Sequence, residues 1–203
     1  RELAIIQGIV PGMEKGEMSL VYQPKMALDT AEIVQAEALA RWNHPTLGPI
    51  TPDEFICLAE RSGQIRLITE WVVKQVCHDL AHWQANGLAI GVAINLSADE
   101  IAQSELEATL APILEQCGHS ERITLEVTES ALLRDPHTAL QNLRALKARG
   151  ARISVDDFGT GYSSLAQLKQ LAPDELKIDK SFVFGLAETP ADQFIVDLII
   201  DLA

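Results

Sequence analysis

Acidic and amide side chains recur at the ends of short apolar segments of this chain, and a lysine accompanies them. The members of this set are Glu37, Asn95, Glu126, Asp156, Asp157 and Lys177. Carboxylate and amide oxygens are the ligands that hard divalent cations prefer. Because like charges held close repel strongly in a low dielectric, such a cluster needs cations to be stable. The set therefore predicts a metal site, and a pair of ions ~3.5–4 Å apart would suit in-line displacement at phosphorus.

Further polar residues flank this set, and a simpler interpretation of each one has to be weighed. Glu129 lies just beyond the segment that holds Glu126, and Asp179 lies in the same segment as Lys177. Lys177 adds a compact positive charge suited to a phosphate oxygen or an attacking water. A single acidic residue at a strand end is more often a solvated loop residue or a helix cap. The interpretation as a site therefore depends on the whole set and on where the strands end.

Two periodicities alternate along the chain and predict the elements that must position these residues. Apolar and β-branched segments predict strands over 18–24, 33–41, 89–96, 122–128, 152–157 and 175–180. Apolar residues three and four apart predict helices over 52–62, 65–86, 98–116, 136–149, 163–171 and 190–203, and residues 1–15 are also helix-like. From residue 88 onward strands and helices alternate, which predicts parallel strands joined by crossover helices.

The strands also indicate how the sheet is arranged. In 122–128 one face carries Ile123, Leu125 and Val127, whereas the other carries Thr124 and Glu126. A doubly wound sheet would be apolar on both faces, whereas a barrel has helices outside and polar groups near its C-terminal mouth. We therefore expect an α/β fold, a modified TIM (β/α)8-type barrel, with about six of the eight βα units present. Because such barrels take ~250 residues, we expect the polypeptide to continue by roughly 50 residues.

Composition excludes some classes of function. The chain has 203 residues, expected to form a single domain over 1–203, with 16 Lys and Arg against 29 Asp and Glu and a net charge of −13. This balance argues against a protein that binds DNA or RNA polymers. The apolar neighbours of Cys57, Cys77 and Cys117 predict three reduced, buried thiols and a reducing compartment. No apolar run reaches the ~18 residues of a membrane span, so we expect no direct membrane insertion.

Several segments together resemble the EAL domain family. They are EALARW at 37–42, INLS at 94–97, LEVTES at 125–130, DDFGTGYSSL at 156–165 and LKIDKSFV at 176–183, with YQP at 22–24 and ITPDEFICLAERSG at 50–63. The resemblance covers essentially the whole chain. It implies a modified TIM barrel that hydrolyses cyclic di-GMP to linear pGpG in bacterial signalling. It also implies Mg²⁺ or Mn²⁺ as cofactor, with two ions at the site.

The resemblance implies a role for each residue that matches a family motif. Glu37, Asn95, Glu126 and Asp156 would be metal ligands, and Asp157 would join the second metal or its bridging water. Lys177 would orient the attacking water or stabilise charge on the phosphate. Substrate contacts would come from Gln23, Arg41 and Asp179. Coupling of a loop to dimerisation would involve Glu129, Phe158 and Gly159.

The resemblance leaves the activity and the context of the domain open. The family pattern continues with an EGVE segment and a QGY segment that lie beyond Ala203, and the first supplies a catalytic glutamate. A cyclic di-GMP receptor without turnover, or a protein-interaction module on the same fold, is the alternative to a hydrolase. We expect a cytoplasmic location, a homodimer, and a covalently linked sensor or diguanylate cyclase domain; the parent protein could be membrane-anchored.

Overall fold

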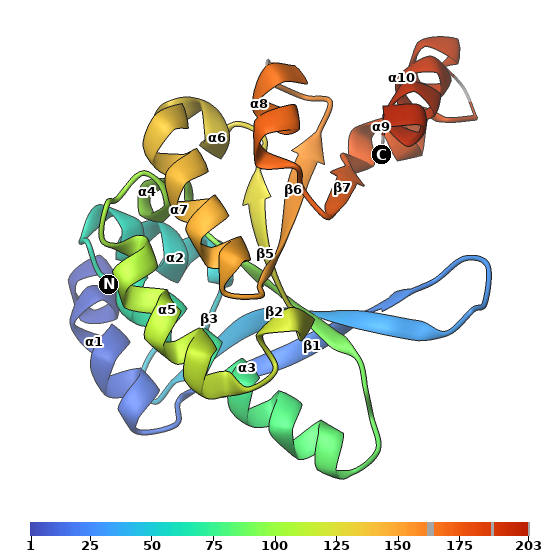
Figure 1. The fold of residues 1–203 in the computed structure, drawn as a ribbon. Coiled ribbons are helices and arrows are strands. Elements are labelled where there is room, and N and C mark those ends of the chain that lie inside the picture. Colours follow the sequence, from blue (N-terminus) through green and yellow to red (C-terminus); the bar gives the residue numbers. More distant parts are fainter. Residues whose placement is uncertain (162–164, 188, 203) are drawn as a thin grey trace.

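The protein is built on one mostly parallel sheet with helices packed along it (Figure 1). The computed structural model describes residues 1–161, 165–187 and 189–202. The strands are β1 (Met18–Met26), β2 (Ile33–His44), β3 (Gly48–Ile50), β4 (Gly91–Asn95), β5 (Ile123–Thr128), β6 (Arg152–Phe158) and β7 (Glu175–Ile178). The helices are α1 (Glu2–Glu14), α2 (Pro52–Arg61), α3 (Ile65–Ala85), α4 (Ala98–Ile101), α5 (Leu106–Cys117), the 3-10 helix η1 (Ser120–Arg122), α6 (Ala131–Arg134), α7 (Pro136–Ala148), α8 (Leu165–Leu171), α9 (Lys180–Gly185) and α10 (Pro190–Leu202).

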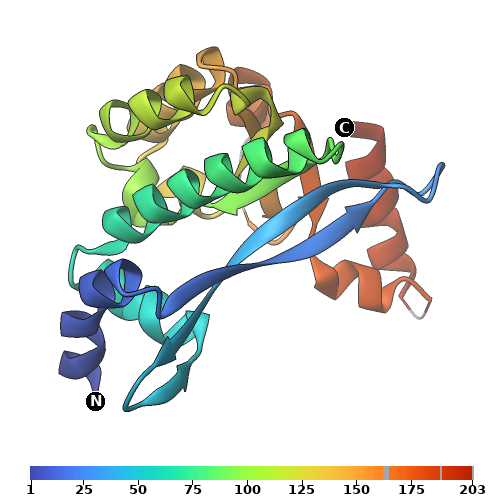
Figure 2. The ribbon, with the colours of Figure 1, turned by 90° about the horizontal axis from the view of Figure 1, so that it is seen from below.

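The strand order places the ends of successive strands side by side. The sheet runs β1-β2-β4-β5-β6-β7, with β3 paired to β2. From β2 to β7 the neighbours on this path are parallel, whereas β1 is antiparallel to β2. β1 and β2 form a long hairpin that projects from the body of the molecule (Figure 2). The expected α/β fold with parallel strands from residue 88 onward is confirmed.

Alternation along the strands separates a helix-covered face from a polar one. In β5 the side chains of Ile123, Leu125 and Val127 are buried in the core. The same core includes Leu110 of α5 and Leu143 of α7, and these helices lie against one another over the sheet. Thr124 and Glu126 alternate with the apolar residues, so they point to the opposite face. Because the aliphatic face of the sheet is buried under the helices, its polar face lines the concave interior.

Several sequence-based boundaries differ from the structure, and two of the differences coincide with hydrogen bonds of polar side chains. The predicted helix 98–116 is two helices, α4 and α5, and at the break between them the carbonyl oxygens of Ile101 and Gln103 accept hydrogen bonds from Asn142 Nδ2 at 3.0 and 2.7 Å. The predicted strand 175–180 ends at Ile178, because the side chain of Asp179 accepts a hydrogen bond from the Ser181 N–H and begins α9. Strand β3 and the short helices η1, α6 and α9 were not predicted. Of the predicted helices, residues 163, 164 and 203 lie outside the described residues.

The cysteine prediction is wrong for at least one thiol. Cys57 is exposed because it lies on the outer side of α2, whose inner side buries Phe55, Leu58 and Ala59. Cys77 and Cys117 are half-buried at the edge of the core. Apolar neighbours in the sequence therefore did not predict whether Cys57 is buried, because residue 57 lies on a different face of the helix from the buried residues.

The sheet is open within the residues that the structure describes, and β1 and β7 are its edge strands. A salt bridge joins these edges across the concave face, since Lys25 Nζ of β1 lies 3.1 Å from Glu175 Oε1 of β7. The curvature is that of a partial barrel, and its polar interior contains the candidate site. Among the described helices, none is long and apolar enough to cross a bilayer.

Candidate active site

Five side chains from five neighbouring strands meet on the concave face, and we call them the carboxylate–lysine cluster. They are Glu37 of β2, Asn95 of β4, Glu126 of β5, Asp156 of β6 and Lys177 of β7. Lys177 is central: its Nζ donates to Asp156 Oδ2 at 2.7 Å and to Glu126 Oε2 at 2.9 Å, and lies 3.8 Å from Glu37 Oε2. Residues separated by up to 140 positions in the sequence thus share one site.

Glu37 of β2 accepts a hydrogen bond from the side-chain amide of Asn95 on the neighbouring strand β4. Asn95 Nδ2 donates to Glu37 Oε1 at 2.7 Å, while the other oxygen of Glu37 faces Lys177. β2 and β4 are parallel and in register with Glu37 opposite Ala93, so Asn95 lies one step nearer the carboxyl end on the same face. The small Ala93 leaves this part of the face open for the two polar side chains.

Glu126 is the buried member of the cluster, and its two oxygens have different partners. The Glu126 side chain is 0% exposed. Its Oε2 accepts from Lys177, whereas its Oε1 accepts from Lys25 Nζ of β1 at 2.5 Å. A buried charge is tolerated only when it is paired and hydrogen-bonded, and here two ammonium groups meet that need.

The electrostatics of the cluster favour a charged lysine. Burial disfavours the ammonium of Lys177, but hydrogen bonds to Asp156 and Glu126 outweigh burial and raise its pKa above the ordinary value. The lysine therefore partly neutralises three carboxylates. The carboxylate–lysine cluster therefore carries a net negative charge at the mouth, and this charge favours the binding of a cation.

The donor set fits a hard divalent cation, although its atoms are not yet arranged around one. Its carboxylate and amide oxygens match the preferences of Mg²⁺ and Mn²⁺. In the described part of the chain, no group of three or more Asp, Glu, His or Cys side chains is placed to hold a metal ion. The ammonium of Lys177 stands between the carboxylates, so an ion would bind there only if the lysine gave up some of these contacts.

Asp157 and Asp179 form a second, more exposed acidic pair. The turn at Asp157 has φ of 53°, a left-handed conformation that Asp tolerates better than most residues, and its N–H donates to Asp156 Oδ1 at 2.8 Å. Burial, together with the charges of Asp156 and Asp179, raises the pKa of Asp157. Asp179 is the N-cap of α9, which lowers its pKa through hydrogen bonds from Ser181.

Glu129 contacts the backbone that follows β6. Its Oε2 accepts hydrogen bonds from the N–H groups of Gly159 and Gly161, both at 3.0 Å, and the residue is 3% exposed. Gly159 has φ of 102°, and an added Cβ would lie 2.9 Å from the ring of Phe182, so only glycine fits. Phe158 beside it is buried. A buried carboxylate therefore fixes the turn that carries Asp157.

Replacing Glu129 with alanine should loosen this turn. The variant removes the carboxylate oxygen that both N–H groups share, and a hydrogen bond to a charged group contributes about 1.5–3 kcal/mol. We expect faster hydrogen exchange at the Gly159 and Gly161 amides and a lower free energy of unfolding. Exchange by mass spectrometry and a urea titration measure both, with Glu105→Ala as the matched change at an exposed glutamate. Unchanged exchange at both glycines would contradict the assignment.

A cavity of about 490 Å³ opens beside the cluster, between β2, β4 and helices α2 to α4. Asn95 lines it together with Arg41, whose Nη1 donates to the Ala40 carbonyl oxygen at 2.8 Å. Gln23 is the register partner of Glu37 on β1 and is exposed. The structure thus places Arg41 and Gln23 near the cluster. Within the described residues, neither side chain forms a hydrogen bond to a member of the cluster.

The family model for the EAL domain matches residues 7–203. The chain belongs to the EAL domain family. It is 40% identical over 203 residues to the bifunctional diguanylate cyclase/cyclic di-GMP phosphodiesterase MucR of Pseudomonas aeruginosa, covering 99% of this chain and 30% of MucR.

A second relative and a solved structure support the EAL assignment. The cyclic di-GMP phosphodiesterase NbdA of Pseudomonas aeruginosa is 38% identical over 205 residues, covering 100% of this chain and 26% of NbdA. The solved structure described as the PaMucR phosphodiesterase in complex with c-di-GMP has a TM-score of 0.88 at 40% identity, covering 98% of this chain and 81% of that one. This EAL chain thus spans about a third or less of the curated relatives' length.

The EAL tripeptide itself lies at the centre of β2, where its three residues have different surroundings. Glu37 points into the cluster and Ala38 is buried in the core, and both Ala38 and Leu39 line the cavity. Strand alternation explains the difference, because residues 37 and 39 share a face and residue 38 points to the other. The family motif therefore combines a polar site residue with the packing that holds it.

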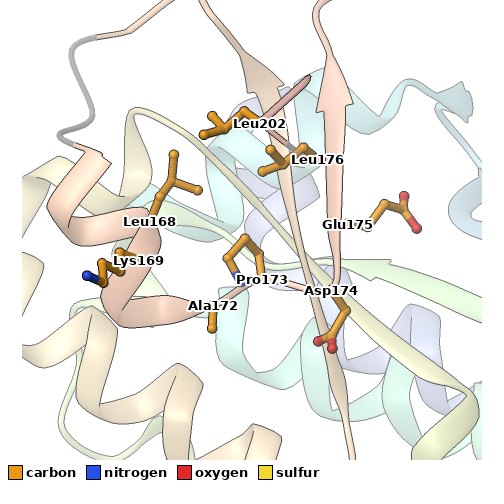
Figure 3. Close-up of a pocket in the computed structure, with 8 residues that line it drawn as sticks. All are labelled: Leu168, Lys169, Ala172, Pro173, Asp174, Glu175, Leu176 and Leu202. Atoms are coloured by element: carbon orange, nitrogen blue, oxygen red, sulfur yellow. The ribbon is translucent and has the colours of Figure 1, made fainter. Parts of the chain in front are cut away.

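A second hollow of the EAL domain lies apart from this site. It measures about 430 Å³ and lies between α8 and β7 (Figure 3). Figure 3 shows Leu168, Leu176 and Leu202 gathered there, whereas the carboxylate of Glu175 points away from them. None of its lining residues in the described chain belongs to the carboxylate–lysine cluster. The hollow therefore offers apolar contact but not the polar groups of the site.

Sequence reasoning missed three polar residues around the EAL site. Lys25 and Glu175 contact one another beneath the cluster, and Glu100 lines the cavity with Oε1 lacking a hydrogen-bond partner in the described residues. Burial raises the pKa of Glu100. A signal for Lys25 was present, since it lies two residues after Gln23 and strand alternation places both on one face.

Proposed function

We propose that this chain is a metal-dependent phosphodiesterase domain that hydrolyses cyclic di-GMP to linear pGpG. The observation that carries the proposal is the carboxylate–lysine cluster, in which side chains of five strands converge at one mouth. Membership of the EAL family and the names of its relatives MucR and NbdA support the choice of substrate.

In this proposal each member of the cluster has a separate task. Glu37, Asn95, Glu126 and Asp156 would hold the divalent cations, and Asp157 would complete the second position. Bound cations would supply Lewis-acid activation of water and phosphate, and they would offset the negative charge of both substrate and site. Lys177 reaches the carboxylates from the adjacent edge strand, so its ammonium could turn toward water or a phosphate oxygen.

Substrate would lie across the mouth and extend into the cavity beside β2. Arg41 lines that cavity and its guanidinium matches a phosphate. Gln23 and Asp179 lie on either side of the cluster, on β1 and at the start of α9. These positions suit polar contacts to a cyclic dinucleotide, whose two phosphates need cationic partners on a chain of net charge −13.

Further parts of the proposal rest on the resemblance to the EAL family. They are two ions of Mg²⁺ or Mn²⁺ at the site, a homodimer, and a covalently linked sensor or diguanylate cyclase domain in a cytoplasmic setting. The name of MucR, which joins both activities in one protein, supports the linked domain. Glu129, Phe158 and Gly159 would couple the site to the dimer through the turn after β6.

Turnover is the test of this function. The full-length protein that contains this chain, with the family's EGVE segment present, is purified and incubated with cyclic di-GMP and Mg²⁺ or Mn²⁺, and products are separated by chromatography. We expect pGpG to form with either ion, and no product with EDTA or with Ca²⁺. Product formation in EDTA would contradict metal dependence, and the absence of product under every condition would contradict the hydrolase.

A nucleotide receptor without turnover is the second candidate. The observation that favours it is that the Lys177 ammonium stands among the carboxylates where ions would bind. This reading predicts that cyclic di-GMP binds in EDTA with unchanged affinity. Calorimetry with EDTA and with Ca²⁺, which is expected to support no turnover, separates the two candidates, because a hydrolase site should bind the dianion more tightly when cations are present.

A further inference from the structure

Lys25 lies beneath the candidate site and reaches it from the opposite side to Lys177. It belongs to β1, an edge strand, yet its ammonium crosses the concave face to β5 and β7. Lys25 Nζ lies 2.5 Å from Glu126 Oε1 and 3.1 Å from Glu175 Oε1. Its side chain is 25% exposed, so the contact with the fully buried Glu126 is sheltered.

The two ammonium groups divide the carboxylate of Glu126 between them. Oε1 faces Lys25 and the lower interior, whereas Oε2 faces Lys177 and the mouth. Glu175 in turn accepts from Lys25 and from the Ser154 hydroxyl at 3.3 Å, which holds Lys25 in place. The carboxylate therefore cannot turn its second oxygen to the mouth without breaking the contact with Lys25.

We infer that Lys25 is a positioning residue that restricts Glu126 to one metal-facing oxygen, an inference that rests on the proposed function. A Glu126 held in this way is a one-oxygen ligand. Without Lys25, both oxygens are free to face the same ion. Groups that hold a metal ligand in one orientation commonly change metal affinity or activity by 10–100-fold when removed.

This restriction has a consequence for metal selectivity. Mg²⁺ requires near-ideal octahedral geometry at short distances, whereas Ca²⁺ accepts two oxygens of one carboxylate and a variable number of ligands. Holding Glu126 to one oxygen therefore favours the smaller ion. Loss of Lys25 should weaken Mg²⁺ binding while Ca²⁺ binding is maintained or strengthened.

The test is a titration of the purified protein with Mg²⁺ and with Ca²⁺ by calorimetry, in the absence of nucleotide. We expect Lys25→Met to lower the ratio of Mg²⁺ to Ca²⁺ affinity by about 10-fold or more. Lys25→Arg, which keeps a charged donor, should retain most of the ratio. Lys147→Met is the matched control, because Lys147 also forms a half-buried ion pair, with Asp174 at 2.9 Å.

The outcomes separate this inference from its alternatives. If Lys25 acted only through its charge, Lys25→Met would tighten binding of both ions together, and the inference would be overturned. Equal affinities in wild type and Lys25→Met would overturn it as well. If Lys25→Met does not fold, the same ratio is measured in Lys25→Gln, a shorter neutral side chain. Absence of Mg²⁺ binding in the wild type would overturn the metal-dependent function itself.

Discussion

Glu37→Gln is expected to lower kcat for cyclic di-GMP hydrolysis by about 10³-fold or more, while the fold is retained. The substitution keeps the shape of the side chain but removes its charge. Glu37 contributes one oxygen toward Lys177 and the other to Asn95, so it is half-buried and bound on two sides. Loss of a carboxylate ligand removes cation binding, on which activation of water depends.

The geometry indicates why a neighbour cannot replace Glu37. It is the acidic member that β2 supplies to the cluster, and Asn95 beside it is neutral. In the glutamine variant the amide nitrogen would face either the Lys177 ammonium, which is a donor, or Asn95, whose amide would have to rotate to present its oxygen. The site would therefore lose a charge and have to rearrange its hydrogen bonds.

Turnover and metal binding should be measured together for this variant. Chromatographic assay of pGpG gives kcat, calorimetry gives the Mg²⁺ affinity, and circular dichroism reports the fold. Glu32→Gln is the control, because Glu32 is an exposed glutamate just before β2 and the charge change is the same. A kcat within tenfold of wild type, with the fold intact, would remove Glu37 from the ligand set.

Lys177→Met is expected to lower kcat by about 10²–10³-fold with little change in KM. The ammonium of Lys177 has contacts to Asp156 and Glu126 that a substrate-loaded site would redirect toward the reacting phosphate or water. An interaction made mainly in the transition state lowers kcat rather than substrate affinity when it is lost. A change in KM alone would contradict this role.

The same variant should be destabilised in the absence of divalent ions. Lys177→Met leaves Glu37, Glu126 and Asp156 facing one another without the ammonium that separates them. We expect a lower Tm in EDTA and recovery of much of the loss on adding Mg²⁺, because the ion then supplies the missing positive charge. Lys169→Met, at an exposed lysine of α8, serves as the control. A Tm that does not respond to Mg²⁺ would indicate that no ion binds between these carboxylates.

Much of the fold was predictable because its determinants are local. Alternation in 122–128 and three-four spacing in 65–86 gave β5 and α3 with boundaries within one residue of the structure. Where a polar side chain bonded to the backbone inside an expected element, the prediction was wrong. Asp179 ended the expected strand at Ile178 by capping α9, and Asn142 of α7 donates to the carbonyl oxygens of Ile101 and Gln103 where the expected helix 98–116 breaks.

The sequence by itself determined which residue types lie at the ends of which strands, because periodicity and motif order are properties of the chain. It therefore indicated that Glu37, Glu126 and Lys177 share a mouth. Only the tertiary structure decided how they pair: that Lys177 stands between the carboxylates, and that Lys25 crosses from an edge strand to Glu126. Such contacts depend on strand register and on the curvature of the sheet. Both are set by packing between segments far apart in sequence, and no local pattern encodes that packing.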